Sequence, residues 1–189
     1  MTRCVWAESS ALMRDYHDHE WGMPTADDRL LFERICLEGF QSGLSWSTIL
    51  TKRDSFRRVF ADFDVERVAD FGDAEIARLV SDPSIVRHAG KIRSTINNAR
   101  RCRELITAEG SLSRFIWRYE PRSPLGAGTT RCPESEVLAR DLRKRGWTFV
   151  GPTTMYAMMQ SLGMVNDHEP GCPTWGMVDV ARRRFERPD

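Results

Sequence analysis

Two pairs of metal-ligating residue types stand far apart in the sequence. His168 and Cys172 are separated by three residues, so on a helical turn or in a tight loop both side chains can face one point. Cys4 and His17 would complete a tetrahedral site, and this mixture of thiolates and imidazoles favours zinc over magnesium or calcium. Four protein ligands leave no open position, which predicts a structural ion joining the N- and C-terminal segments. His19 is an alternative to His17, and a buried cysteine beside a capping histidine has the same spacing.

Glu38 stands at the end of an apolar run and directly before the glycine-containing segment 39–43. A carboxylate is unfavourable at the C-terminal end of a helix, and glycines let the backbone come close to another group. The rings of Tyr16, Trp21 and Trp46 would stack a flat ligand whose N–H groups Glu38 accepts. The alternative is an exposed glutamate beside an ordinary helix break, with the tryptophans in the core.

The segment 84–92, Ser-Ile-Val-Arg-His-Ala-Gly-Lys-Ile, predicts a short hairpin followed by a basic amphipathic helix. Gly90 would let the backbone approach a phosphate, the first N–H groups of the helix would donate to it, and Lys91 would add charge. Six basic residues and no acidic one lie between Ile85 and Arg103. This pattern is typical of helix-hairpin-helix binding to the DNA backbone, and a plain helical turn with a solvated basic face is the alternative.

The elements that would position these residues are predicted to be helices. Apolar residues recur at helical spacing through 30–35, 49–60 and 92–106, and sustained alternation is missing. The residues expected to cap helices are Asp64, Asp73 and Ser135 at N-termini and Gly110, Gly146 and Gly163 at C-termini. The sequence therefore predicts an all-α fold, with a long loop in the proline- and glycine-rich segment 120–133.

The composition of the 189 residues is that of a globular protein. The sequence is 41% apolar and 29% charged, with 28 basic and 27 acidic residues, which argues against a disordered chain. We expect one unit of two helical lobes over 1–189, with the helix-hairpin-helix near 84–106. No run approaches the ~20 apolar residues of a membrane span, and five scattered cysteines do not resemble a secreted disulfide framework. We therefore expect a cytoplasmic protein that works at the nucleoid.

Taken together, these segments resemble the DNA-3-methyladenine glycosylase I family of helix-hairpin-helix DNA glycosylases. The resemblance runs from Arg3 to Cys172. Its specific pieces are Tyr-His-Asp-His-Glu-Trp-Gly at 16–22 and the segments 36–39, 43–46, 87–92, 144–154 and 164–168.

The resemblance implies zinc bound by the two terminal pairs, with His17 rather than His19 as the ligand. It also implies a base pocket built from Tyr16, Glu38 and Trp46. Trp21 remains a candidate wall of this pocket on the residue pattern alone. The implied substrate is double-stranded DNA with alkylated bases, and the implied product is free 3-methyladenine.

The reaction implied by this resemblance is hydrolysis of an N-glycosidic bond weakened by the positive charge of the methylated base. Glu38 is the expected catalytic residue, and because the segment 38–46 contains no lysine we expect a monofunctional enzyme that leaves an abasic site. The expected DNA contacts are Leu44, as a wedge in the space left by the flipped base, and His88, Gly90 and Lys91 in the hairpin. We expect a monomer.

Two other classes of function are compatible with the same residues. One is a non-catalytic module that binds lesions and marks them for partners, and the other is a zinc-containing helical interaction domain. A carboxylate among aromatic rings favours the enzyme, because a protein that only holds DNA gains nothing from a negative charge near phosphates.

Overall fold

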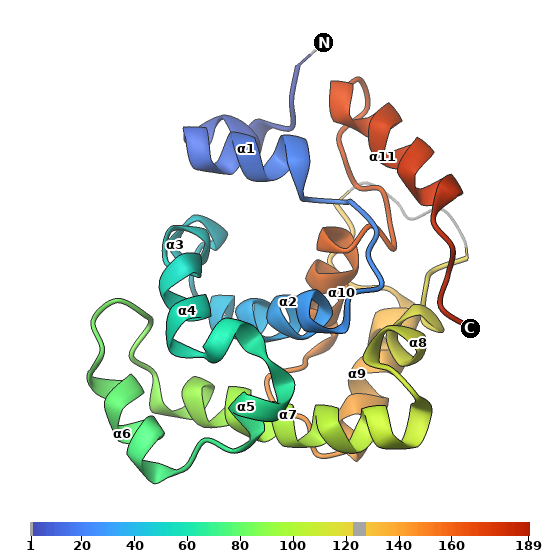
Figure 1. Cartoon of the computed structure of the whole chain (residues 1–189). Coiled ribbons are helices and arrows are strands. Elements are labelled where there is room, and N and C mark those ends of the chain that lie inside the picture. Colours follow the sequence, from blue (N-terminus) through green and yellow to red (C-terminus); the bar gives the residue numbers. More distant parts are fainter. Residues whose placement is uncertain (1, 123–127) are drawn as a thin grey trace.

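The computed structural model describes residues 2–122 and 128–189. Within these ranges the chain forms helices and no β-strand, which confirms the all-α prediction (Figure 1). The elements are η1 (Val5–Ser9), α1 (Ala11–His19), α2 (Asp28–Gln41), α3 (Trp46–Thr51), α4 (Arg53–Val59), η2 (Ala61–Phe63), α5 (Val65–Ala69), α6 (Asp73–Ser81), α7 (Ala89–Glu109), α8 (Leu112–Trp117), α9 (Pro133–Lys144), α10 (Pro152–Ser161) and α11 (Pro173–Arg184).

Helix α2 is the central element of the fold, and it packs against α3, α7, α8 and α10 (Figure 1). The Asp27 carboxylate starts the helix by accepting hydrogen bonds from the N–H groups of Arg29 and Leu30. Every residue from Leu31 to Phe40 is buried, since the helix has neighbours on all sides. Glu38 is thereby carried into the interior of the protein.

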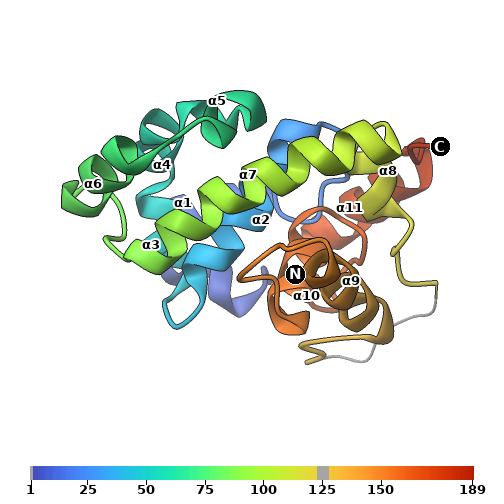
Figure 2. The ribbon, with the colours of Figure 1, turned by 90° about the horizontal axis from the view of Figure 1, so that it is seen from below.

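Helix α7 is the longest helix, with 21 residues, and runs along one side of the molecule (Figure 2). Helices α5 and α6 pack against it, and α6 is joined to it by the segment 82–88. The His88 side chain caps its first turn, and Gly110 ends it at a φ of 92°, a left-handed conformation that favours glycine.

Several of the predicted helix ends lie one to three residues from the observed ones. Asp64 caps α5 as predicted, whereas α6 is capped at Gly72 because the Glu75 carboxylate accepts the Gly72 N–H. Helix α9 begins after Cys132, whose sulfur accepts the Ser135 N–H, so the predicted cap Ser135 lies inside the first turn.

The long loop predicted over 120–133 corresponds to the connection between α8 and α9, of which residues 123–127 lie outside the described residues. Helices α1 and α11 lie at the same end of the molecule, where the N- and C-terminal segments approach each other (Figure 1). Across the described ranges, no helix combines the length and the apolar character that a bilayer span requires.

Candidate active site and metal centre

A cavity of about 200 Å³ opens where α1, α2, α3 and α10 meet the segment of η1. The four predicted ligand-contacting residues, Tyr16, Trp21, Glu38 and Trp46, all line it. Further lining residues, which the sequence analysis did not single out, are Trp6, Met13, Gln41, Ala157 and Gln160. The structure therefore brings aromatic rings from three separate segments around one carboxylate.

The aromatic rings that line the cavity pack against one another. Tyr16 and Trp46 lie with their centroids 5.3 Å apart and their planes tilted by 41°, while Trp6 meets Trp21 edge to face at 5.1 Å. Tyr16 is buried in α1, and Trp46 begins α3 directly after the Ser45 cap. Because each ring packs against another, the cavity keeps flat apolar walls without a ligand.

Glu38 is 5% exposed, and its carboxylate makes no hydrogen bond to any residue that the structure describes. Burial raises the pKa of Glu38 to about 8, and the nearby positive charge of Arg34 opposes this rise only in part. The Glu38 oxygens are not among the fully enclosed polar atoms that lack a partner in the described residues, so they open into the cavity. A ligand that brings N–H donors into the cavity could therefore bond to them directly.

The Tyr16 hydroxyl is hydrogen-bonded to a network of ion pairs that lies partly buried beside α1. Its hydroxyl accepts a hydrogen bond of 3.2 Å from Arg34, which also donates to Glu20 at 2.9 Å. Arg53 donates two further hydrogen bonds to the same Glu20 carboxylate. Burial raises the pKa of Tyr16 further above its usual range, so the phenol keeps its proton as a donor for a ligand.

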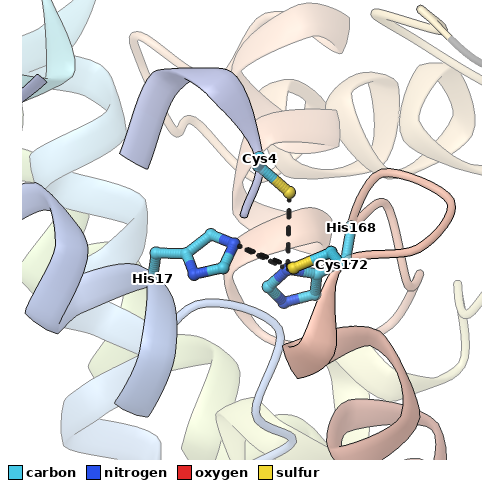
Figure 3. Close-up of side chains that lie close together, drawn as sticks. All are labelled: Cys4, His17, His168 and Cys172. Atoms are coloured by element: carbon cyan, nitrogen blue, oxygen red, sulfur yellow. Dashed lines mark hydrogen bonds between the residues drawn. The ribbon is translucent and has the colours of Figure 1, made fainter. Parts of the chain in front are cut away.

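The second cluster unites the two pairs of metal-ligating residues. Cys4, His17, His168 and Cys172 are buried, and their ligand atoms lie within 4.8 Å of one another. His17 Nε2 lies 3.1 Å from His168 Nδ1 and 3.5 Å from the Cys172 sulfur, and Cys4 Sγ lies 3.7 Å from His168 Nδ1 (Figure 3). Two sulfurs and two ring nitrogens thus face a common centre, as a group that can hold a metal ion.

In both imidazoles, the ring nitrogen that points away from the cluster lies within hydrogen-bond distance of an oxygen acceptor. His17 Nδ1 lies 2.8 Å from the Asp18 carboxylate, and His168 Nε2 lies 3.3 Å from the Trp21 carbonyl oxygen. Protons at these positions leave the inward nitrogens as lone-pair donors, which is the arrangement of metal-bound histidines. His19 is exposed and bonded to Asp15, so the structure brings His17 and not His19 into the cluster.

The sequence matches a known family over most of its length. A sequence model described as methyladenine glycosylase covers residues 6–175. The chain belongs to the methyladenine glycosylase family. It is 42% identical over 179 residues to DNA-3-methyladenine glycosylase 1 of Escherichia coli K12, an alignment that covers 91% of this chain and 96% of that protein.

Solved structures of this family have the same fold. A crystal structure of 3-methyladenine DNA glycosylase I superposes with a TM-score of 0.87 at 42% identity, covering 91% of this chain and 98% of that one. A single-residue variant of 3-methyladenine DNA glycosylase I in complex with 3-methyladenine superposes with a TM-score of 0.86 at 32% identity, covering 92% of this chain and 97% of that one.

The pocket of this methyladenine glycosylase family member rests directly on its metal-ligating cluster. Trp6 meets the His17 ring edge to face at 5.1 Å, and both residues contact Trp21. Spacing alone did not reveal Trp6, because its role depends on a contact between η1 and α1 that only the folded chain makes.

The residues predicted to contact DNA lie around the starts of α3 and α7. Leu44 is 41% exposed in the turn after α2, and His88 and Gly90 are exposed at the start of α7. The Lys91 side chain is buried, and its ammonium group donates to the carbonyl oxygens of Phe40 at 2.8 Å and Ser42 at 2.5 Å. Lys91 thus faces the end of α2, which is not the orientation that the predicted phosphate contact requires.

Proposed function

We propose that this protein is a monofunctional DNA glycosylase that hydrolyses the N-glycosidic bond of 3-methyladenine in alkylated DNA. Its products would be the free base and an abasic site. The observation that carries the proposal is the carboxylate of Glu38, a residue only 5% exposed, which opens into an aromatic cavity. The names of the similar proteins, and the 3-methyladenine complex of one of them, support the same substrate.

Discrimination between damaged and normal adenine would rest on charge. Methylation at N3 makes the base cationic in DNA, and an aromatic face is worth ~2 kcal/mol to a desolvated cation that neutral adenine does not gain. The positive charge of the bound base would lower the raised pKa of Glu38, so that the ionised carboxylate accepts the N–H groups of the base in charge-assisted hydrogen bonds. The cavity volume of about 200 Å³ is below the ~300 to 1,000 Å³ of drug-sized sites, which suits one nucleobase flipped out of the helix.

Hydrolysis would need little acid catalysis, because the cationic base is already a good leaving group. Glu38 would favour bond cleavage by holding the departing base, and water would attack the sugar at its developing positive charge. A bifunctional enzyme would need a lysine nucleophile, and none of the described residues lining the cavity is a lysine. The nearby Lys52 donates to the carbonyl oxygens of Pro83 and Ser84 instead.

DNA would bind across the starts of α3 and α7. The exposed His88 and Gly90 would place backbone N–H groups at the start of α7 against phosphates, in a helix-hairpin-helix formed by α6, the segment 82–88 and α7. Leu44 would enter the space left by the flipped base. Because the Lys91 ammonium faces α2, its contribution to DNA binding would be indirect.

Zinc is the metal that we propose for the cluster of two thiols and two imidazoles, a donor set that suits a structural tetrahedral ion. The ion would join the N- and C-terminal segments of a single unit of two lobes and take no part in the reaction. We also propose that the protein acts as a monomer in the cytoplasm, on DNA of the nucleoid.

Incubation with alkylated double-stranded DNA, followed by chromatography of the released bases, tests the function. Release of 3-methyladenine is expected, with unmethylated adenine retained in the DNA. Binding of methylated DNA without base release would instead favour a non-catalytic lesion-binding module. A protein with neither activity would fit the third class, a zinc-containing interaction domain.

A further inference from the structure

We infer that Phe149 is a DNA-contact residue, whose ring packs on a deoxyribose of the strand held at the start of α7. This inference rests on the proposed glycosylase function, because it needs DNA at that surface. Phe149 lies in the segment between α9 and α10, which runs beside α7 (Figure 2).

The position of Phe149 links the pocket helix to the hairpin. A Cβ at Gly39, the residue after Glu38, would lie 3.5 Å from the Phe149 Cβ, so the segment packs closely on α2. At its other end the ring reaches α7, where a Cβ at Gly90 would lie 4.0 Å from its outermost carbon. The His88 ring meets it edge to face at 6.3 Å. Phe149 therefore lies between α2 and the start of α7, beside the proposed phosphate contacts.

The backbone of Phe149 is strained. Its φ of 55° lies in the left-handed region, which a bulky side chain rarely adopts. The residue is nonetheless 40% exposed, so burial of apolar surface does not fully offset the strain. A glycine or asparagine would adopt this conformation more easily. A large apolar residue that is both strained and exposed points to a functional contact outside the protein.

The surrounding residues hold this conformation in place. The Asn98 side chain accepts the Thr148 N–H at 2.9 Å and donates to the Thr148 carbonyl at 2.9 Å, and the Thr148 hydroxyl bonds to Ser94 at 2.7 Å. Trp147 and Val150, on either side, are buried. Because the flanking backbone is fixed to α7, the Phe149 ring is presented in one orientation and loses little entropy on binding.

Charge around this surface indicates DNA as the occupant. Arg87 and Arg93 flank the start of α7, both are exposed, and neither forms an ion pair within the described ranges 2–122 and 128–189. Unpaired arginines attract phosphates, while an apolar ring beside them suits the carbon face of a sugar. A DNA strand supplies both chemistries at adjacent positions.

The test compares Phe149→Ala and Phe149→Gly with the wild-type protein on a duplex that contains a stable abasic-site analogue. We expect both variants to bind it roughly threefold to tenfold more weakly, as fluorescence anisotropy measures. The salt dependence of binding should stay unchanged, since an apolar contact releases no counterions, whereas Arg87→Ala should reduce it. Affinity for free 3-methyladenine should also be unchanged, and the melting temperature of Phe149→Gly should equal or exceed the wild-type value.

A control variant is Val180→Ala, which shortens an exposed apolar side chain on α11, far from the start of α7 (Figure 1). It should bind the duplex with wild-type affinity. Wild-type affinity in folded Phe149→Ala would overturn the inference while the glycosylase function stands. A lowered melting temperature in Phe149→Gly together with wild-type affinity for the duplex would overturn it in favour of a purely structural role. A wild-type protein that neither binds the duplex nor releases 3-methyladenine would overturn the proposed function and this inference together.

Discussion

The Trp21 indole meets the His168 imidazole edge to face, with ring centroids 4.6 Å apart and planes inclined by 77°. Trp21 lines the cavity, and His168 belongs to the metal-ligating cluster. Trp6, which contacts Trp21, makes the same kind of contact with His17. Two aromatic walls of the pocket, Trp6 and Trp21, therefore pack against two candidate metal ligands. Loss of a bound metal should disturb the pocket as well as the fold.

Removal of the metal is the first prediction. We expect about one zinc per chain, and we expect Cys172→Ser or strong chelation to lower the melting temperature by roughly 10 °C or more, since losing even ~3 kcal/mol has that effect in a domain of this size. The affinity for 3-methyladenine should fall together with the melting temperature. Elemental analysis, thermal unfolding and base titration are the measurements.

The matched control for this experiment is Cys132→Ser. Cys132 is also buried, but its sulfur only caps α9, a task that a serine hydroxyl performs. The variant should keep its zinc and its melting temperature within a few degrees. A well-folded wild-type protein free of metal, with unchanged melting after chelation, would refute the metal centre.

Substitution of Lys91 tests its role at the end of α2. Lys91→Met keeps most of the stem but removes the hydrogen bonds to the Phe40 and Ser42 carbonyls. Because bonds to charged groups are worth ~1.5 to 3 kcal/mol, the free energy of unfolding should fall by about that amount in urea titrations. DNA binding should weaken too, since these carbonyls lead into the turn with Leu44.

Arg93→Met is the comparison on the same helix. Arg93 is exposed and unpaired within the described ranges, so its loss should change the free energy of unfolding by less than about 0.5 kcal/mol. It should weaken DNA binding and reduce the salt dependence. If Lys91→Met were as stable as the wild type and showed the reduced salt dependence instead, Lys91 would contact phosphate directly.

The pKa of Glu38 predicts how stability depends on pH. The unfolded chain ionises this group near 4.5, whereas burial keeps the folded protein protonated until about 8. The contribution of the neutral carboxyl to the free energy of unfolding is therefore largest below pH 4.5, and it is lost as the pH rises towards 8. The Glu38→Gln variant lacks this loss, so its stability relative to wild type should increase across that window and then level off. Urea unfolding of both proteins at several pH values measures the difference, and a constant difference would show that Glu38 is ionised in the empty pocket.

Trp46 provides one stacking face in the proposed pocket. Trp46→Ala should weaken binding of 3-methyladenine roughly tenfold to a hundredfold, because stacking on an aromatic ring is worth ~1 to 3 kcal/mol per base. Trp46→Phe should retain much of the affinity. The indole N–H has no partner within the described residues, so phenylalanine removes no protein hydrogen bond. Calorimetric titration of the two variants is the measurement, and equal affinities of the alanine and phenylalanine variants would show that the ring at position 46 does not stack on the base.

Patterns of local chemistry were sufficient to predict much of this molecule. Helical spacing predicted the all-α fold, and the placement of glycines predicted the ends of α7 and α9 to within about two residues. Residue types alone suggested that the rings of Tyr16 and Trp46 could enclose a ligand bound by Glu38, and the resemblance to a family implied the same pocket, but residues from three helices share no spacing in the sequence that would show their contact.

Side-chain orientation could not be predicted in the same way. Lys91 lies in a basic segment, and nothing local indicates that its ammonium turns toward two carbonyls of another helix. The strained conformation of Phe149 depends on hydrogen bonds between its neighbour Thr148 and Asn98, which lies fifty residues before Thr148 in the chain. Long-range contacts of this kind are set by packing, which periodicity and capping signals do not describe.

The central claim is that the Glu38 carboxylate recognises the methylated base, and Glu38→Gln tests it most directly. The amide keeps the size of the side chain but replaces an anionic acceptor, and a charge-assisted bond is worth ~1.5 to 3 kcal/mol. Glu33→Gln is the control, because Glu33 is a buried carboxylate of the same helix that pairs with Arg57 and does not line the cavity. The measurement is a titration with free 3-methyladenine, paired with the rate of base release from alkylated DNA. We predict a tenfold to hundredfold loss of affinity and slower release in folded Glu38→Gln, with affinity retained in Glu33→Gln. Wild-type affinity and release in folded Glu38→Gln would contradict the account.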